Sequence, residues 1–206
     1  MNLLMRPIAK ALASLTIRMQ ELRLRLRVEG CKAGGLTVGK NVSMHGGVFI
    51  DDDYPYLISI GDNCYLDDGV RLIAHDAGVV RVTDGCIRLG RVDIRDNCYI
   101  GPNCIILPGV TIGPDVCVMA GSLVNRDIPP NSCVAGVPAR FYSKFDEMIE
   151  YHGKQEREGP VFRYDEVSQR PSKELREKVK VAVRDRDSYV VGFKGRHVAL
   201  INGDKR

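Results

Sequence analysis

Residues 94–129 read IRDNCY-IGPNCI-ILPGVT-IGPDVC-VMAGSL-VNRDIP, which is six successive blocks of six residues. Every block opens on Ile or Val, and its fifth residue is Cys, Ser, Val or Ile. The Asn, Asp, Gly and Pro residues between these two positions favour turns. Two inward-facing side chains in each block suit a short strand followed by a bend. The repeat therefore predicts a parallel coil in which three blocks close one triangular turn.

The same period continues towards the N-terminus, with one interruption. Further blocks start at Val38, Met44, Ile50, Ile60, Leu66 and Leu72, and a partial block starts at Val134. Twelve blocks make about four coils, stacked about 4.8 Å apart as in any sheet. Cys64, Cys98 and Cys104 occupy fifth positions, where we expect them to fill the core as small apolar groups. The fold class is thus mainly β, with a parallel β-helix over residues 36–140.

The flanking segments read as helices. Residues 1–30 form a predicted amphipathic helix with apolar and arginine-rich faces. Two interpretations stay open: the helix covers the open end of the β-helix or a neighbouring subunit, or it rests on an anionic membrane surface. Residues 141–206 are expected to be a helical extension and tail, with helices in 141–155, capping the other end of the β-helix, and in 172–186. His152 and His197 are expected at the surface.

Composition excludes several functions. The net charge of +4 is too small to indicate nucleic-acid binding, and no basic segment carries interleaved aromatic residues. Seven cysteines without a CxxC pair favour a reducing, cytoplasmic location. Arg6 and Lys10 interrupt the apolar N-terminal residues, so we expect no secretory leader there, and no run of about 18 apolar residues predicts a membrane span.

The interruption of the repeat lies beside a histidine. His75 is the fourth residue of the block that starts at Leu72, and the next block starts only at Ile94. An insertion such as the loop 76–93 is usually functional, and here we expect it to form one wall of a pocket over His75. A histidine at a pocket mouth can act as a general base near neutral pH.

Stacking of the blocks indicates which groups lie beside His75. The equivalent position one coil earlier is Asp53, and one coil later it is Gly109. Asp53 is therefore expected to orient the imidazole, with Asp52 and Asp76 as alternatives. The acidic run also offers a different role, in which Asp51, Asp52 and Tyr54 bind the hydroxyls of a sugar.

Residues 38–140 resemble the hexapeptide-repeat acyltransferases. The segment ILPGVTIGPDVCVMAGSLVNRDIPPNSCVAGVPARF (106–141) carries this resemblance. DDDYPYLISIGDNCYLDDGVRLIAHDAG (51–78) is more narrowly similar to the branch that decorates capsule and lipopolysaccharide sugars. The resemblance implies a left-handed β-helix, an acetyl-CoA donor, a catalytic histidine at His75 in the AHD segment, and a homotrimer with active sites between subunits.

The resemblance also implies a donor site. Pro102 and Ala120 match positions along which pantetheine runs. Asn125 and Arg126 stand where the family often has Thr and Lys, and Arg140 matches a basic position for the adenosine phosphate. Ser143 departs from a second basic position, for which Lys144 is a substitute.

The resemblance, together with His75, implies direct transfer of an acetyl group to a sugar hydroxyl of a polysaccharide, glycolipid or sugar precursor. His75 would remove the hydroxyl proton, and a backbone N–H near Gly109 would stabilise the oxyanion. No metal is expected, because the coils hold only His45 and His75 and a three-histidine zinc site cannot be assembled. The alternatives are N-acetylation of a nucleotide-linked amino sugar and a β-helix scaffold without activity.

Overall fold

The computed structural model describes residues 5–168, 171–184, 187–191 and 199–201. These residues fall into two compact units. The first runs to Phe145 and includes the strand at 199–201, and the second begins at Asp146. Each unit is described by itself.

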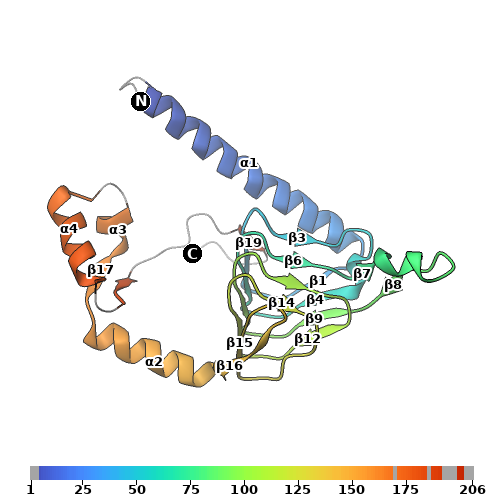
Figure 1. The fold of residues 1–206 in the computed structure, drawn as a ribbon. Helices are drawn as coiled ribbons and strands as arrows, with labels where there is room; N and C mark the ends of the chain where they lie inside the picture. Colours follow the sequence, from blue (N-terminus) through green and yellow to red (C-terminus); the bar gives the residue numbers. More distant parts are fainter. Residues whose placement is uncertain (1–4, 169–170, 185–186, 192–198, 202–206) are drawn as a thin grey trace. The chain divides into compact units, whose positions relative to one another are not determined.

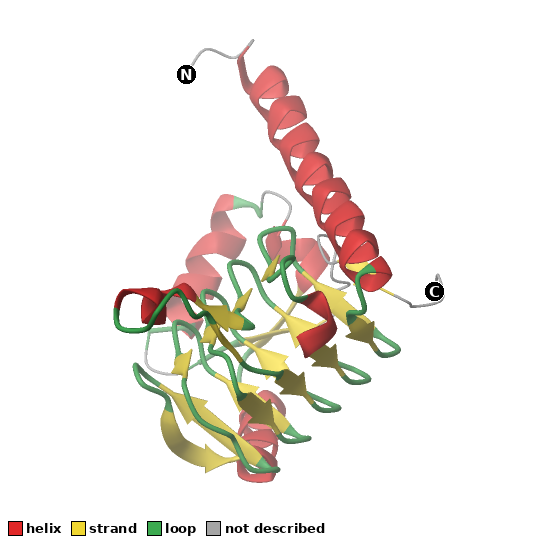
Figure 2. Ribbon diagram, turned by 90° about the vertical axis from the view of Figure 1, so that its right-hand side faces the viewer, coloured by secondary structure: helices red, strands yellow, loops and turns green. Residues whose placement is uncertain are grey.

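The first unit is built from three parallel sheets that form the sides of a prism (Figures 1 and 2). One sheet, called side A, contains β1 (Thr37–Val38), β4 (Ile58–Ile60), β9 (Val92–Ile94) and β12 (Val110–Ile112). Side B contains β2 (Val42–Met44), β5 (Tyr65–Leu66), β10 (Tyr99–Ile100), β13 (Val116–Val118) and β15 (Ser132–Ala135). Side C contains β3 (Phe49–Ile50), β6 (Arg71–Leu72), β11 (Ile105–Ile106) and β14 (Leu123–Val124). The chain visits the sides in the order A, B, C through four coils, which confirms the predicted β-helix.

The register of the strands is the register of the sequence repeat. The first residues of the blocks pair with one another up each side, for example Ile50 with Leu72 and Leu72 with Ile106. Every block-opening residue is buried except Val38, which packs against the core from a partly buried position. Cys64, Cys98 and Cys104 are also buried, as predicted. Burial raises the pKa of the Cys104 thiol, so this group stays protonated at neutral pH.

The fourth residue of a block makes the turn. It has a positive φ in eight blocks, at Asn41, Asn63, Gly69, Asn97, Asn103, Gly109, Asp115 and Gly121. Gly, Asn and Asp adopt this left-handed conformation at the lowest cost. On one edge the Asn side chains also bond in a ladder, with successive Nδ2 to Oδ1 distances of 3.1 Å from Asn41 through Asn63 and Asn97 to Asp115. At these turn positions, the Asn, Asp and Gly residues of the repeat thus set the backbone conformation and are not catalytic.

The helix α1 (Met5–Ala33) covers the first coil with its C-terminal half. Leu24, Val28 and Cys31 belong to the buried core, which confirms the first interpretation of this segment. Gly46 permits the close approach, because a Cβ there would lie 2.9 Å from the Cβ of Gln20.

A second apolar face of α1 is exposed. Its members are between 44% and 65% exposed: Ile8, Leu12, Leu15, Met19, Leu22 and Leu26. They alternate in steps of four and three residues, and at 100° per residue they lie on the side of the helix opposite Leu24, Val28 and Cys31. We call these six residues the exposed stripe. Among the described residues, no helix has the length and apolar content that spanning a bilayer requires.

The end of the β-helix differs from the prediction. Residues 140–144 do not start a helix; they form β16 (Arg140–Lys144), which pairs antiparallel with β15. The helix α2 (Phe145–Glu158) begins only afterwards. At the other end of side B, β19 (Ala199–Ile201) pairs antiparallel with β2. The backbone hydrogen bonds of the edge strand β16 therefore override the helical pattern read from the sequence.

The second unit contains α2, β17 (Val161–Arg163), α3 (Tyr164–Ser168), α4 (Lys173–Ala182) and β18 (Tyr189–Val191). The helix α4 confirms the second predicted C-terminal helix, and the Ser172 hydroxyl caps it by accepting from the Leu175 N–H at 3.1 Å. His152 is exposed, as expected, and its Nδ1 lies 2.8 Å from the Tyr189 hydroxyl. His197 lies outside the described residues.

Candidate functional site

Two insertions emerge side by side from the same edge of the prism. The strand pairings place 22 residues between Val38 and Ile60 and 34 between Ile60 and Ile94, whereas a regular coil of three blocks has 18. The first coil therefore carries four extra residues and the second carries sixteen. Both insertions follow neighbouring strands of side C, β3 and β6, at the edge between sides C and A.

The longer insertion is an ordered hairpin. The strand β7 (His75–Asp76) pairs antiparallel with β8 (Arg88–Leu89), and a short 3-10 helix η2 (Ala77–Arg81) follows β7. Figure 1 shows this hairpin projecting from the prism beyond β7 and β8. The Asp76 carboxylate accepts from the Gly78 N–H at 2.8 Å and so caps η2. The alternative that Asp76 orients His75 is wrong, because its side chain is held by its own loop.

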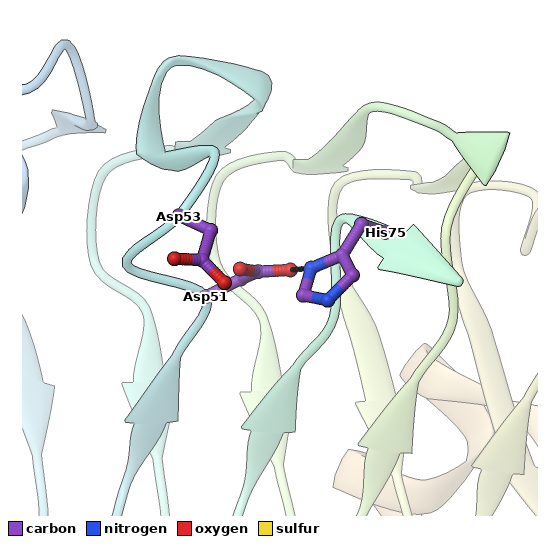
Figure 3. A group of neighbouring side chains, drawn as sticks. All are labelled: Asp51, Asp53 and His75. Carbon is purple, nitrogen blue, oxygen red and sulfur yellow. Dashed lines mark hydrogen bonds and ion pairs between the residues drawn. The ribbon is translucent and has the colours of Figure 1, made fainter. Parts of the chain in front are cut away.

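The hairpin presents His75 to a buried carboxylate (Figure 3). Nδ1 of His75 lies 2.6 Å from Oδ2 of Asp51, and the same oxygen accepts from the Ala74 N–H at 2.8 Å. Asp51 is 1% exposed, whereas the His75 side chain is 28% exposed. Because a carboxylate oxygen accepts, Nδ1 carries the proton of this bond, and Nε2 is left unprotonated in the neutral ring. The arrangement is that of an oriented general base.

The residue that orients His75 is Asp51 and not Asp53 or Asp52. Asp53 and His75 are the fourth residues of their blocks, and stacking would align them only if both blocks kept the regular turn. Neither residue adopts the positive φ of the regular turns. Each instead lies in an insertion, so the two chains diverge after Ile50 and Leu72. Asp51, the second residue of its block, remains within reach of the imidazole. Four other blocks hold Gly at this second position, but the block that starts at Leu66 also has an Asp there, so the residue type alone does not single out Asp51.

The same observation corrects the acceptor role predicted for Asp51, since a carboxylate that is 1% exposed cannot contact a sugar. The other acidic residues of the run, Asp52 and Asp53, are exposed. The half-buried Tyr54 lies beside the imidazole, with 5.3 Å between the ring centroids. Tyr54 precedes a short 3-10 helix, η1 (Pro55–Leu57), that belongs to the first insertion. Tyr54 therefore lines the same edge of the prism as His75.

Asp51, Asp53 and His75 also form a potential cation site, since each offers a ligand atom and these atoms lie within 4.8 Å of one another. The hydrogen bond to Asp51 occupies Nδ1, so a cation between the three groups would have to displace that proton. His45 cannot contribute to this site. It follows β2, on a different edge, where its Nε2 is 2.7 Å from the Tyr65 hydroxyl.

The backbone N–H of Gly109 is not an oxyanion donor. It already donates to the Arg91 carbonyl at 2.9 Å, where β9 begins after the long insertion. The side chain of Arg88 returns across the same edge and donates to the Pro108 carbonyl at 3.1 Å. The prediction that Gly109 supplies a free donor is therefore wrong, because the chain that returns from the hairpin accepts from its N–H.

The predicted donor residues lie on two edges of one chain. Asn125 and Arg126 are exposed and follow β14, at the edge that also carries His75. Pro102 and Ala120 follow β10 and β13, at the edge between sides B and C. The exposed Arg140 opens β16, and its Nη1 donates to the Ala139 carbonyl at 2.9 Å. One chain does not gather all five residues around one pocket.

Comparison with known families gives a match at residues 91–126 to the model described as bacterial transferase hexapeptide (six repeats). SAR2635 of Staphylococcus aureus (strain MRSA252), provisionally named an acetyltransferase, is 32% identical over 135 residues, covering 55% of this chain and 67% of that protein. YvoF of Bacillus subtilis (strain 168), also provisionally named an acetyltransferase, is 36% identical over 115 residues, covering 56% of this chain. The galactoside O-acetyltransferase of Escherichia coli (strain K12) is 33% identical over 117 residues, also 56% of this chain. The chain spans 64% of the length of YvoF and 57% of that of the galactoside enzyme.

Proposed function

Because the chain belongs to the bacterial hexapeptide-repeat transferase family, with its left-handed β-helix, we propose that it is an acetyl-CoA-dependent O-acetyltransferase acting on a sugar hydroxyl. The acceptor is a sugar of a polysaccharide, a glycolipid or a sugar precursor. The observation that carries the proposal is the 2.6 Å bond between His75 Nδ1 and the buried Asp51 carboxylate, at the one edge where both insertions emerge. Similarity to a galactoside O-acetyltransferase supports the reaction class.

The mechanism follows from the two ring nitrogens. Asp51 holds the proton on Nδ1, so Nε2 can take the proton of the acceptor hydroxyl as its oxygen attacks the thioester carbonyl. The C–O bond forms and the C–S bond breaks, and the imidazolium returns its proton to the leaving thiolate. The Asp51 carboxylate stabilises the imidazolium meanwhile. A covalent acyl-enzyme is not needed, and two of the coil thiols are poor nucleophiles, since burial raises the pKa of Cys104 and raises that of Cys117 to about 12.

The acceptor lies over the exposed side of His75. Asp53 and Asp52 can accept hydrogen bonds from sugar hydroxyls, and the Tyr54 ring offers an apolar face next to the imidazole. The hairpin of β7, η2 and β8 forms the second wall of this pocket. His75, oriented by Asp51, holds the reacting hydroxyl, while Asp53, Asp52 and Tyr54 place the ring that carries it.

The activity test uses the whole chain, acetyl-CoA and a panel of free, phosphorylated and polymeric sugars, with thiol release and product mass as readouts. An ester product on a hydroxyl supports the proposal. An amide product on amino sugars alone would make the chain an N-acetyltransferase. No transfer, together with no thermal shift on adding CoA, would indicate that the chain is a β-helix scaffold without activity.

The active site lies between copies of the chain, and the assembly is a homotrimer. Asn125 and Arg126 are on the His75 edge, whereas Pro102 and Ala120 are on another edge. A donor bound near Arg126 therefore contacts Pro102 and Ala120 of a second copy of the chain. Light scattering at micromolar concentration is expected to give three times the mass of 22.9 kDa. A monomer that still binds CoA at full affinity would contradict this assembly.

The exposed stripe of α1 contacts an anionic membrane surface from the cytoplasmic side. Arg18, Arg23 and Arg25 border the six apolar residues, which is the pattern of a helix lying in a lipid interface. The same arginines repel a second α1 helix, so they disfavour a paired coiled coil. Replacing Leu12 and Leu15 by Gln is expected to lower cosedimentation with vesicles containing anionic lipid by about ten-fold or more, since two exposed apolar side chains no longer enter the lipid.

The matched control for this experiment is Ile149→Gln together with Tyr151→Gln, two exposed apolar residues on α2. This variant should sediment like the unmodified chain. Equal sedimentation with neutral and anionic vesicles would remove the role of the arginines. Loss of the trimer in the Leu12→Gln/Leu15→Gln variant would assign the stripe to a neighbouring subunit instead.

A further inference from the structure

A cavity of about 530 Å³ lies between α1 and the first coil, on the outer face of side C. Its walls come from the C-terminal half of α1, from the turn at Gly46 and Gly47, and from strands β3 and β6. The volume is within the range of small-molecule sites. None of the proposed acceptor or donor residues lines it.

The cavity is cationic and has an aromatic wall. Arg23, Arg27 and Arg71 line it, and no Asp or Glu does. The Phe49 ring packs against two of the guanidinium groups, with its centroid 5.3 Å from Cζ of Arg27 and 4.5 Å from Cζ of Arg71. Within the described part of the chain, none of the three arginines forms an ion pair with a carboxylate. Three guanidinium groups that line one cavity without a carboxylate suit an anion with several oxygens, because each fork can bind two of them.

The position of the cavity separates it from the donor. Phe49 and Arg71 belong to the first two coils, whereas Asn125 and Arg126 follow the last strand of side C. Two or three coil spacings of about 4.8 Å lie between them. The phosphates of CoA, if held by Arg126 and Arg140, therefore contact guanidinium groups other than the three that line this cavity.

The cavity is close enough to His75 to serve the acceptor. Arg71 and His75 are four residues apart on one nearly extended segment, which spans at most about 14 Å. A sugar ring with the phosphate on its anomeric carbon covers much of that distance. An anion held by Arg71 would thus leave its sugar within reach of the base.

We propose that this cavity binds the diphosphate group of a glycosyl diphosphate acceptor and so selects acceptors by the group on their anomeric carbon. The inference rests on the proposed acetyl transfer and adds the class of acceptor to it. Arg23 directly follows Leu22, so the cavity opens beside the exposed stripe of α1. A diphosphate attached to a membrane lipid is therefore the form that fits, and a nucleoside diphosphate sugar carries the same anion in solution.

The first test is binding without catalysis. Inorganic pyrophosphate is titrated calorimetrically into the whole chain in the presence of saturating CoA, which occupies the donor site. Arg23→Ala and Arg71→Ala should each weaken this binding by about ten-fold or more, as expected for the loss of a charged hydrogen-bond partner. Arg71→Lys keeps the charge but loses the forked guanidinium, so its affinity for pyrophosphate should lie between those of the unmodified chain and Arg71→Ala. Arg95→Ala, which removes an exposed arginine outside the cavity, should leave the affinity unchanged.

The second test is kinetic. With glycosyl diphosphates, Arg23→Ala and Arg71→Ala should raise the acceptor KM by about ten-fold or more and leave the acetyl-CoA KM unchanged. Arg126→Ala and Arg140→Ala should raise the acetyl-CoA KM and leave the acceptor KM unchanged. A short isoprenyl diphosphate sugar and a nucleoside diphosphate sugar are the two acceptor arms, and the one with the lower KM identifies the source of the diphosphate.

The outcomes separate this inference from the proposed function. Acetyl transfer to free sugars, with pyrophosphate binding that is the same in all variants, would overturn the cavity assignment and leave the acetyltransferase standing. Pyrophosphate binding that depends on Arg23 and Arg71, without transfer to any acceptor, would support the cavity and contradict the enzyme. Thermal melting of each variant excludes misfolding as the cause of lost binding.

Discussion

His75→Ala is expected to lower kcat for acetyl transfer by about 10²–10⁴, the usual contribution of a general base. The reason is that the neutral ring, oriented by Asp51, presents an unprotonated Nε2 beside Tyr54. CoA binding, measured by calorimetry, should not change, because the proposed donor residues are elsewhere on the coil.

The alanine variant also removes a partner of the buried Asp51 carboxylate, so a small loss of stability is expected and could obscure the result. His75→Asn is the matched control, since its side-chain amide can place an N–H where Nδ1–H stood and still cannot act as a base. We expect it to melt close to the unmodified chain and to be as inactive as His75→Ala. Near wild-type transfer by either variant at every pH tested would remove His75 from the mechanism.

The same assays also test the cation alternative. Transfer that is lost on treatment with a chelator and restored by a divalent cation would mean that Asp51, Asp53 and His75 hold an ion. Transfer that is insensitive to a chelator in the unmodified chain, and absent in His75→Asn, would support the general base.

Asp51→Asn is expected to lower kcat by about 10²–10⁴, nearly as much as loss of the base itself. Oδ2 accepts from both the Ala74 N–H and Nδ1–H, so an amide oxygen at that position keeps both bonds but lacks the charge that stabilises the imidazolium. An amide NH2 group at that position would instead force Nδ1 to accept, and the ring proton would move to Nε2. Nitrogen chemical shifts of a labelled histidine ring distinguish these two orientations, apart from any effect on the rate.

Asp53→Asn is the matched control for Asp51, because it removes the same charge within the same cluster but lies on the exposed side. We expect less than a ten-fold change in kcat, with the main effect on the acceptor KM, as for a residue that contacts a sugar hydroxyl. A larger loss of kcat in Asp53→Asn than in Asp51→Asn, with the tautomer unchanged in the latter, would restore Asp53 as the residue that orients the base.

The coils of this protein could be predicted from the sequence because each block satisfies its own local requirements. An aliphatic first residue and a small fifth residue fill the interior, and an Asn, Asp or Gly at the fourth position adopts the left-handed turn. These requirements recur every six residues, so a block whose own pattern is ambiguous can be assigned from its neighbours. The position of the interruption after His75 is visible for the same reason.

The pairing of side chains at the site could not be read in this way. Four extra residues after Ile50 and sixteen after Leu72 end the periodic register at the place where the chemistry lies. The path of two adjoining insertions then decides that Asp51 bonds to His75, that Asp53 stays exposed, and that the Gly109 N–H donates to the Arg91 carbonyl. The cavity at Phe49 depends on still longer contacts, since α1 must fold back onto the first two coils to bring Arg23 and Arg27 to Arg71. Local periodicity thus determines the scaffold of this protein, whereas the contacts that give it a site form only between segments that the sequence keeps apart.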